Sequence, residues 1–184
     1  SAAPRRTYAL SKLDLSYHPY IALAAWKLDR PVAIIYTRQE SMRSTTKRHP
    51  SQIELKIGCG TDGKILALEF EGNFNTGAYA SWGPTVANRV PVHASGPYKI
   101  PNYVAISKAI HTNTPNAGAF RGFGVPQTAI ALETTLSELA SKAGFDELDF
   151  RILNCLRNGD PTVTGQSFEM GVGIKSCLEA IQPK

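Results

Sequence analysis

The sequence has 184 residues, of which 42% are hydrophobic and 19% charged, and its net charge is +5. This composition excludes an intrinsically disordered chain and predicts a globular domain, while the length is too short for a complete multi-cofactor enzyme. Apart from Arg5, Arg6 and a cluster within residues 38–48, the basic residues are spread among acidic ones. The charge therefore argues against sequence-specific nucleic-acid binding, and a bound anion explains it as well.

Cysteine usage and hydropathy indicate the compartment. Three cysteines lack the spacing of a disulfide framework or a zinc site, and no apolar run approaches the roughly 20 residues that span a bilayer. Residues 1–30 do not have the pattern of a secretory signal. We therefore expect a cytoplasmic protein with no membrane partner. Because the sequence begins without methionine, we also expect it to be processed or cut from a longer protein.

The first part of the chain predicts a helix followed by a strand. Residues 18–28 are rich in alanine and leucine and begin with a proline at position 19, which favours a helix. Residues 32–36 form a short, β-branched apolar run with the length of a buried strand.

Two alternating runs predict an antiparallel hairpin. Apolar and polar residues alternate over 52–57 and again over 66–70, and a turn sequence with Asp-Gly occupies 61–63 between them. We expect a third strand at 103–110 and a short helix at 85–93.

The last third of the chain predicts helices. Residues 128–143 carry leucines on one face and are followed by Gly144, a residue typical of a helix end. Asp146 is a good cap for a second helix, and residues 173–181 predict a third. The expected fold class is α+β, an antiparallel sheet packed with helices.

Two apparent motifs do not predict sites. Residues 58–63 spell GxGxxG, but a second alternating strand follows where a dinucleotide-binding motif needs a helix. The four histidines lie far apart in unrelated contexts, so we predict no metal ligands in this chain. They are His18, His49, His93 and His111.

The most informative segment is residues 114–127, directly before the predicted 128–143 helix. Three closely spaced glycines allow backbone N–H groups to approach a bound group, and the helix start adds partial positive charge that suits an anion or oxo ligand. The glycines are Gly118, Gly122 and Gly124. Composition alone leaves open an ordinary glycine-rich loop whose phenylalanines pack in the core.

The sequence Ala119-Phe120-Arg121-Gly122-Phe123-Gly124, followed by Pro126-Gln127, resembles the signature loop of the molybdenum hydroxylases, the xanthine dehydrogenase and aldehyde oxidase family. Other motifs resemble the family in its order, and the resemblance covers about residues 12–182. They are Lys12-Leu13-Asp14-Leu15-Ser16, His18-Pro19-Tyr20, Ala24-Ala25-Trp26-Lys27, Arg30-Pro31-Val32, Arg48-His49-Pro50, Tyr98-Lys99-Ile100-Pro101-Asn102 and Leu153-Asn154-Cys155-Leu156-Arg157. It implies a single α+β domain over 12–184, similar to the first half of the molybdopterin-binding region, after an N-terminal extension of residues 1–11.

The resemblance implies hydroxylation of a purine, N-heterocycle or aldehyde with water as the oxygen source. Molybdenum on a molybdopterin, which we expect in its cytosine dinucleotide form, would carry the chemistry, and 2Fe-2S clusters and FAD on partner subunits or domains would receive the electrons. The base is a glutamate that we expect beyond Lys184, so no catalytic residue is expected within this chain, and the isolated chain should be inactive.

The family's site residues transfer to the matching positions here. Ala119, Arg121 and Gly122 would contact the cofactor. Phe123 would stack on the substrate ring, and Phe120 would shape the pocket. Arg89 lies 32 positions before Arg121, where purine-oxidising members carry an arginine that stabilises negative charge on the substrate.

Two departures from the family pattern support a different interpretation. Family members carry a glycine-rich loop before the lysine that Lys12 matches, whereas residues 6–11 here read Arg-Thr-Tyr-Ala-Leu-Ser. Leu13 stands where purine hydroxylases have a glutamate, which argues against a purine substrate. The alternative function is a non-catalytic assembly or cofactor-handling module that retains the fold. The intact loop at 119–124 favours the hydroxylase.

Overall fold

The computed structural model describes residues 17–182. The predicted extension at 1–11 and the positions of Lys12 and Leu13 lie outside these residues. No helix in the described part is long and apolar enough to cross a membrane. The elements are α2 His18–Leu28, α3 Arg38–Ser44, β1 Ser51–Cys59, β2 Ile65–Gly77, α4 Gly83–His93, β3 Asn102–His111, α5 Val125–Ala143, α6 Glu147–Asn154 and α7 Ile174–Ala180.

The predicted hairpin is confirmed. β1 and β2 pair antiparallel, and the tight turn between them is closed by a hydrogen bond from the N–H of Gly60 to the carbonyl of Lys64 at 2.9 Å. Gly63 has φ of 78°, a conformation that glycine adopts without strain. The GxGxxG sequence is therefore the end of β1 and its turn, not the entry to a helix.

The third strand exists, but its expected direction was wrong. The sheet order is β1-β2-β3, and β3 pairs parallel to β2. The reason is the intervening helix α4, which returns the chain to the starting end of β2, as a parallel neighbour requires. The sheet is therefore mixed rather than antiparallel, while the α+β arrangement of the sheet and its helices holds.

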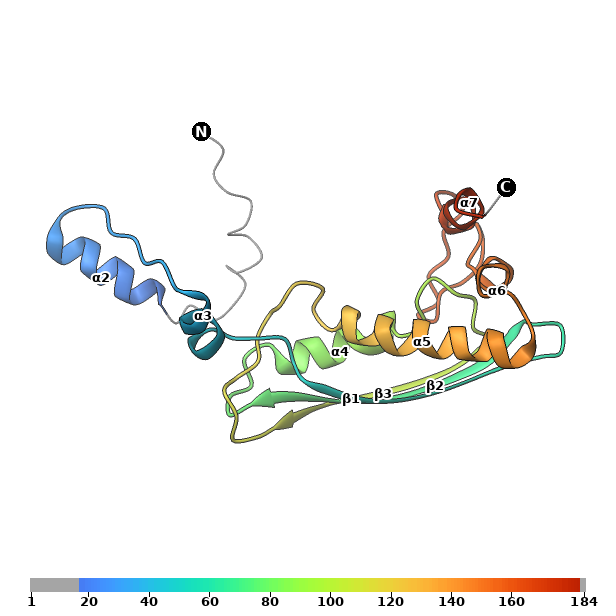
Figure 1. Ribbon diagram of the computed structural model, residues 1–184, viewed down its shortest axis with the longest axis horizontal. Helices are drawn as coiled ribbons and strands as arrows, with labels where there is room; N and C mark the ends of the chain where they lie inside the picture. The colour runs from blue at the N-terminus through green and yellow to red at the C-terminus, as the bar shows by residue number, and fades with distance from the viewer. Residues whose placement is uncertain (1–16, 183–184) are drawn as a thin grey trace.

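Helices α4 and α5 cover one face of the sheet (Figure 1). The strands send alternate side chains to that face, and α5 buries one residue per turn against it. The helix predicted over 128–143 is confirmed and ends at Gly144, whose φ is 80°. The buried positions of α5 are Thr128, Leu132, Leu136 and Ala140.

Helix α6 is hydrogen-bonded to the β1–β2 hairpin. Asp146 caps it as predicted, by accepting hydrogen bonds from the N–H groups of Leu148 and Asp149. At the other end of α6, the buried Asn154 side chain accepts from the N–H of Ile65 at 2.8 Å and donates to the carbonyl of Gly63 at 2.9 Å. The motif around Asn154 therefore has a structural role.

Residues 17–44 form an arm that stands away from the rest of the molecule, which we call the body, residues 45–182 (Figure 1). The helix predicted over 18–28 is confirmed as α2, and α3 begins with a capping box between Thr37 and Glu40. The strand predicted over 32–36 is not formed. Neither helix of the arm contains a buried residue. The prediction of a buried strand was therefore wrong for this chain.

Candidate functional site

The glycine loop, residues 117–124, connects β3 to α5 and lies against two other segments. The N–H of Ala117 donates to the carbonyl of Thr76 at 2.9 Å, and the N–H of Gly118 donates to the carbonyl of Lys47 at 3.0 Å. A Cβ on Gly118 would lie 2.9 Å from the Thr46 hydroxyl oxygen, so only glycine fits at this approach. The end of β2 and residues 46–47 therefore fix the start of the loop.

The second half of the loop turns tightly with three consecutive positive φ angles. They are 89° at Gly122, 53° at Phe123 and 95° at Gly124. The N–H of Phe123 donates to the carbonyl of Phe120 at 2.8 Å. A Cβ on Gly124 would lie 2.8 Å from a methyl carbon of Val90. The glycines therefore serve both the turn and its contact with α4.

Arg48 supports the loop from outside. Its Nη2 donates to the carbonyl of Arg121 at 2.6 Å, its Nη1 lies 3.5 Å from Oε1 of Gln127, and its guanidinium carbon lies 4.7 Å from the centre of the Phe120 ring. Gln127 in turn donates to the carbonyl of His49 at 3.1 Å. Partial burial lowers the pKa of Arg48, but an arginine side chain in a protein remains cationic at neutral pH.

The loop offers hydrogen-bond donors that the chain itself does not use. The N–H groups of Ala119, Arg121 and Gly122 have no acceptor among residues 17–182. Beneath the loop, the hydroxyl of Thr46 is buried and also has no partner there. Unpaired donors beside the cationic Arg48 fit an anionic group rich in acceptor atoms, which is the chemistry of a molybdopterin.

An aromatic wall borders the loop. The rings of Phe123 and Trp82 meet edge to face, with centroids 6.0 Å apart and an interplanar angle of 67°. Trp82 is 44% exposed and stands just before α4. The two rings form an apolar surface beside the open donors, which suits a flat ligand.

Arg89 lies on the helix that packs against the loop. Val86 and Val90, which flank it in α4, contact Gly124. The Nε of Arg89 donates to Nε2 of His93, one turn later, at 3.3 Å. Burial and the neighbouring arginine both lower the pKa of His93, so the imidazole is kept neutral and able to accept this bond. No hydrogen bond within the described residues joins Arg89 to the loop.

The structure thus brings five predicted site residues into one loop and places the sixth, Arg89, on the adjacent helix. Sequence reasoning did not assign roles to four side chains that hold or border the loop. They are Arg48, Gln127, Trp82 and His93. Arg48 belonged to a noted basic cluster, and Gln127 directly follows the loop motif, so both had a signal. Nothing in the sequence linked Trp82 to Phe123, because that contact depends on the packing of α4.

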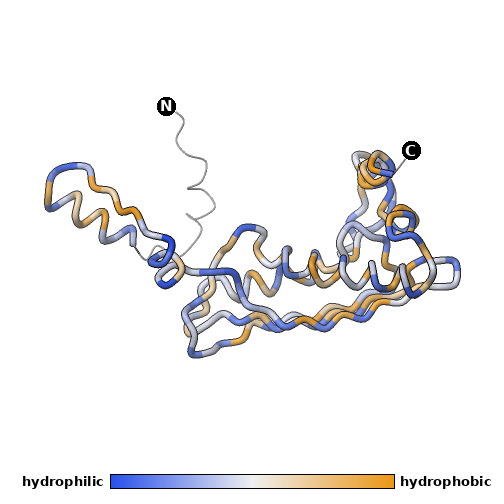
Figure 2. Tube along the Cα trace, viewed as in Figure 1, coloured by the Kyte–Doolittle hydropathy of each residue, from blue (hydrophilic) through white to orange (hydrophobic). Residues whose placement is uncertain are grey.

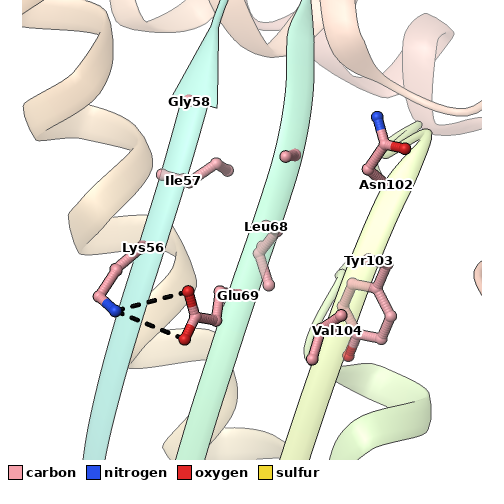
Figure 3. A pocket seen from close by; sticks show the side chains of 9 residues that line it. Lys56, Ile57, Gly58, Leu68, Glu69, Asn102, Tyr103 and Val104 are labelled. Carbon is pink, nitrogen blue, oxygen red and sulfur yellow. Dashed lines mark hydrogen bonds and ion pairs between the residues drawn. The ribbon is translucent and has the colours of Figure 1, made fainter.

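A hollow elsewhere on the sheet is not part of this site. It has a volume of about 370 Å³ and is lined near the start of β2 and β3 by residues that include Leu68 and Val104. The ion pair of Lys56 and Glu69, 3.4 Å long, joins β1 and β2 in its lining (Figure 3). The glycine loop is hydrogen-bonded to β2 at Thr76. Thr76 lies about 25 Å from Leu68 along the strand, at about 3.3 Å per residue. Among residues 17–182, no group of histidine, cysteine and carboxylate side chains has the arrangement of a metal site.

The chain matches known proteins over the segments that build this site. Residues 11–155 match the family described as molybdopterin cofactor-binding domain. The nicotinate dehydrogenase large molybdopterin subunit of Eubacterium barkeri is 42% identical over 173 residues, which cover 94% of this chain and 41% of that protein. A probable xanthine dehydrogenase subunit of Bacillus subtilis is 44% identical over 149 residues, covering 81% of this chain and 20% of that protein.

The fold recurs in a solved structure. The aldehyde oxidoreductase of Desulfovibrio gigas superposes with a TM-score of 0.81 at 32% identity, covering 91% of this chain and 18% of that one. The chain therefore spans less than half the length of each of these three relatives. The match over residues 11–155 includes the glycine loop and the elements that support it, and the chain belongs to the molybdopterin cofactor-binding domain family.

Proposed function

We propose that this chain is part of the molybdenum-binding subunit of a hydroxylase similar to xanthine dehydrogenase and aldehyde oxidase, which uses water as its oxygen source. The observation that carries the proposal is the glycine loop, whose N–H donors at Ala119, Arg121 and Gly122 have no acceptor among residues 17–182. Support comes from the family and from relatives named as molybdopterin and xanthine dehydrogenase subunits.

The cofactor would be held by the loop backbone. Ala119, Arg121 and Gly122 would donate their N–H groups to it, and Arg48 would keep the loop in shape through the carbonyl of Arg121. When bound, the molybdenum cofactor supplies the oxidation chemistry of the site. A cytosine dinucleotide form of the cofactor, partner 2Fe-2S and FAD units, a cytoplasmic location and a catalytic glutamate beyond Lys184 belong to the same proposal.

The substrate would lie against the aromatic wall. Phe123 would stack on its ring, Phe120 would shape the pocket, and Arg89 would stabilise negative charge that develops on it. Among purine, N-heterocycle and aldehyde substrates, we favour an N-heterocycle. Leu13 argues against a purine, and one relative is named a nicotinate dehydrogenase.

A non-catalytic module that retains the fold is not favoured. An assembly module has no need for a loop with strained backbone and unpaired donors, and a cofactor-handling module has no need for the apolar wall of Trp82 and Phe123 beside them. Three consecutive positive φ angles, one of them at a phenylalanine, are maintained here by contacts from α4 and by Arg48.

The test replaces one glycine of the loop in the complete subunit. Gly122→Ala introduces a side chain at φ of 89°, where its Cβ would lie 2.5 Å from a ring carbon of Pro126. Gly159→Ala is the matched control, because Gly159 has φ of 83° and no atom within 4 Å of its Cβ position. Both changes carry a similar backbone cost of about 1–2 kcal/mol, but only the first distorts the loop.

We expect Gly122→Ala to reduce the molybdenum and pterin bound per subunit at least tenfold, while Gly159→Ala retains them. The measurements are elemental analysis for molybdenum and fluorescence of the oxidised pterin, with circular dichroism to establish that both variants fold. If folded Gly122→Ala retains full molybdenum and pterin content, the loop does not hold the cofactor. Absence of both from the unaltered complete subunit would refute the proposed function itself.

A further inference from the structure

We propose that residues 31–36 of the arm add to the edge of a β-sheet in the part of the molybdopterin subunit that this chain does not contain. The inference rests on the proposed function, because it assumes that such a subunit exists. It assigns a specific role to the one segment whose predicted strand is not formed.

The segment has the side-chain pattern of a strand. Figure 1 shows it running alongside α2 from the far end of the arm back to α3, apart from the sheet of the body. Exposure alternates along it: Ile34 is 45% and Tyr36 38% exposed, whereas Ile35 between them is 90% exposed. This period of two is that of a strand with α2 against one face and nothing against the other. Helix α2 and the segment therefore resemble one helix and one strand of an α/β unit whose other strands are missing.

The backbone of the segment also lacks hydrogen-bond partners in the part of the chain that the structure describes. Within residues 17–182, no hydrogen bond is made by the N–H or carbonyl groups of residues 31–36. An extended segment with free donors and acceptors is the usual template for pairing with another strand. A helix packed on Ile35 would cover its side chain but leave these backbone groups unpaired. A neighbouring strand would cover the side chain and also pair the backbone groups.

Residues of high hydropathy occur in the segment and again in α2 (Figure 2). Trp26 is 78% and Tyr20 70% exposed. Several large, exposed apolar residues within one short stretch of a folded protein are typical of an interface. The partner therefore presents a predominantly apolar surface beside its free strand edge.

Comparison with the relatives favours the remainder of the subunit, rather than a second copy of this chain, as the partner that covers the segment. The family match over residues 11–155 includes the whole arm, so the arm is a regular feature of the domain. In the aldehyde oxidoreductase of Desulfovibrio gigas, the superposition covers 91% of this chain. The arm makes up about 15% of the chain, so the matched fold extends into it. Those relatives carry more than half of their length outside the match, which provides the covering polypeptide.

Hydrogen–deuterium exchange on two samples tests the inference: this chain alone and the complete molybdopterin subunit. We expect the amides of residues 32–36 to exchange at nearly the unprotected rate in the isolated chain and at least 100-fold more slowly in the complete subunit. Equally fast exchange in the complete subunit would overturn the proposal. Protection that appears in the isolated chain together with a dimer on size exclusion would also overturn it, in favour of a second copy.

A pair of variants separates pairing from general damage. Ile35→Asp should leave the melting temperature of the isolated chain unchanged, because the side chain is already 90% exposed, but should lower that of the complete subunit and restore fast exchange at 32–36. Ile35→Val, which keeps a β-branched apolar residue, should retain both properties of the complete subunit. An Ile35→Asp subunit with unaltered melting and exchange would contradict the proposal. Protection of 32–36 in a subunit without molybdenum would support this inference and refute the proposed function.

Discussion

Two aromatic residues show how differently the body and the arm accommodate apolar side chains. Phe74, in the central strand of the body, is 0% exposed, whereas Trp26, in the first helix of the arm, is 78% exposed. The body packs helices against one face of its sheet and buries the side chains of that face within the chain. The arm has helices with good local signals but no buried residue.

This difference shows that local helix formation and tertiary burial are separate properties of a sequence. Pro19 at the start of α2 and the capping box of Thr37 and Glu40 define helix ends without any tertiary contact. Burial requires a second surface, which the body has in its own sheet and helices. We therefore expect the stability of the isolated chain to reside in the body, with little contribution from the arm.

The largest effect is expected in the core of the body. Phe74→Ala should lower the free energy of unfolding by about 3–5 kcal/mol, since it removes a fully buried aromatic ring and leaves a cavity. Ile130→Ala, on the exposed side of α5 at 71% exposure, is the control and should change it by less than about 0.5 kcal/mol. Urea unfolding of the isolated chain measures both. Similar losses in the two variants would mean that the core is not where we place it.

The next effect concerns the buried amide that joins α6 to the hairpin. Asn154→Ala should lower the free energy of unfolding by about 2–4 kcal/mol, because the N–H of Ile65 and the carbonyl of Gly63 would lose their buried partners. Asn158→Ala serves as the control, since the exposed Asn158 side chain accepts a single bond within residues 17–182, from the N–H of Val172. Equal urea midpoints for Asn154→Ala and the unaltered chain would show that α6 does not depend on this side chain.

A smaller effect is a loss of stability in mild acid. Burial lowers the pKa of His49 below its usual 6.5, so the unfolded chain binds a proton more readily than the folded one. The stabilisation from neutral His49 is complete above pH 6.5 and is lost as the pH falls below it. His93, whose pKa is also lowered, acts in the same direction.

The urea midpoint of the isolated chain should therefore decrease between pH 7 and pH 5, and His49→Gln should make this decrease smaller. His18→Gln, at an exposed position of the arm, should leave the decrease unchanged. The carboxyl groups with lowered pKa, such as those of Asp160 and Glu71, act mainly below pH 5 and are the same in the unaltered chain and both variants, so the comparison of slopes isolates the histidines. An identical slope in His49→Gln would refute the assignment to this imidazole.

The sequence was sufficient wherever the signal is local. Alternation and an Asp-Gly turn identified the β1–β2 hairpin, and Asp146 and Gly144 identified helix ends. The direction of β3 was not predicted, although α4 was foreseen, because its parallel pairing follows from the path of the whole β2–α4–β3 unit. The residues of the loop came from the resemblance, whereas its supports Arg48 and Trp82 depend on tertiary contacts between distant segments.

The strand predicted at 32–36 does not form because it has no neighbour among the described residues, and the smallest of the expected effects tests this explanation. Its β-branched residues favour an extended backbone, but a strand also needs a neighbour, and none lies within residues 17–182. If the arm stands free in solution, Trp26→Ala should change the free energy of unfolding of the isolated chain by less than about 0.5 kcal/mol, although a buried tryptophan would lose about 3–5 kcal/mol. Urea unfolding decides between these values. A loss above about 1 kcal/mol would show that α2 packs against the body, and then the body and the arm would share one core.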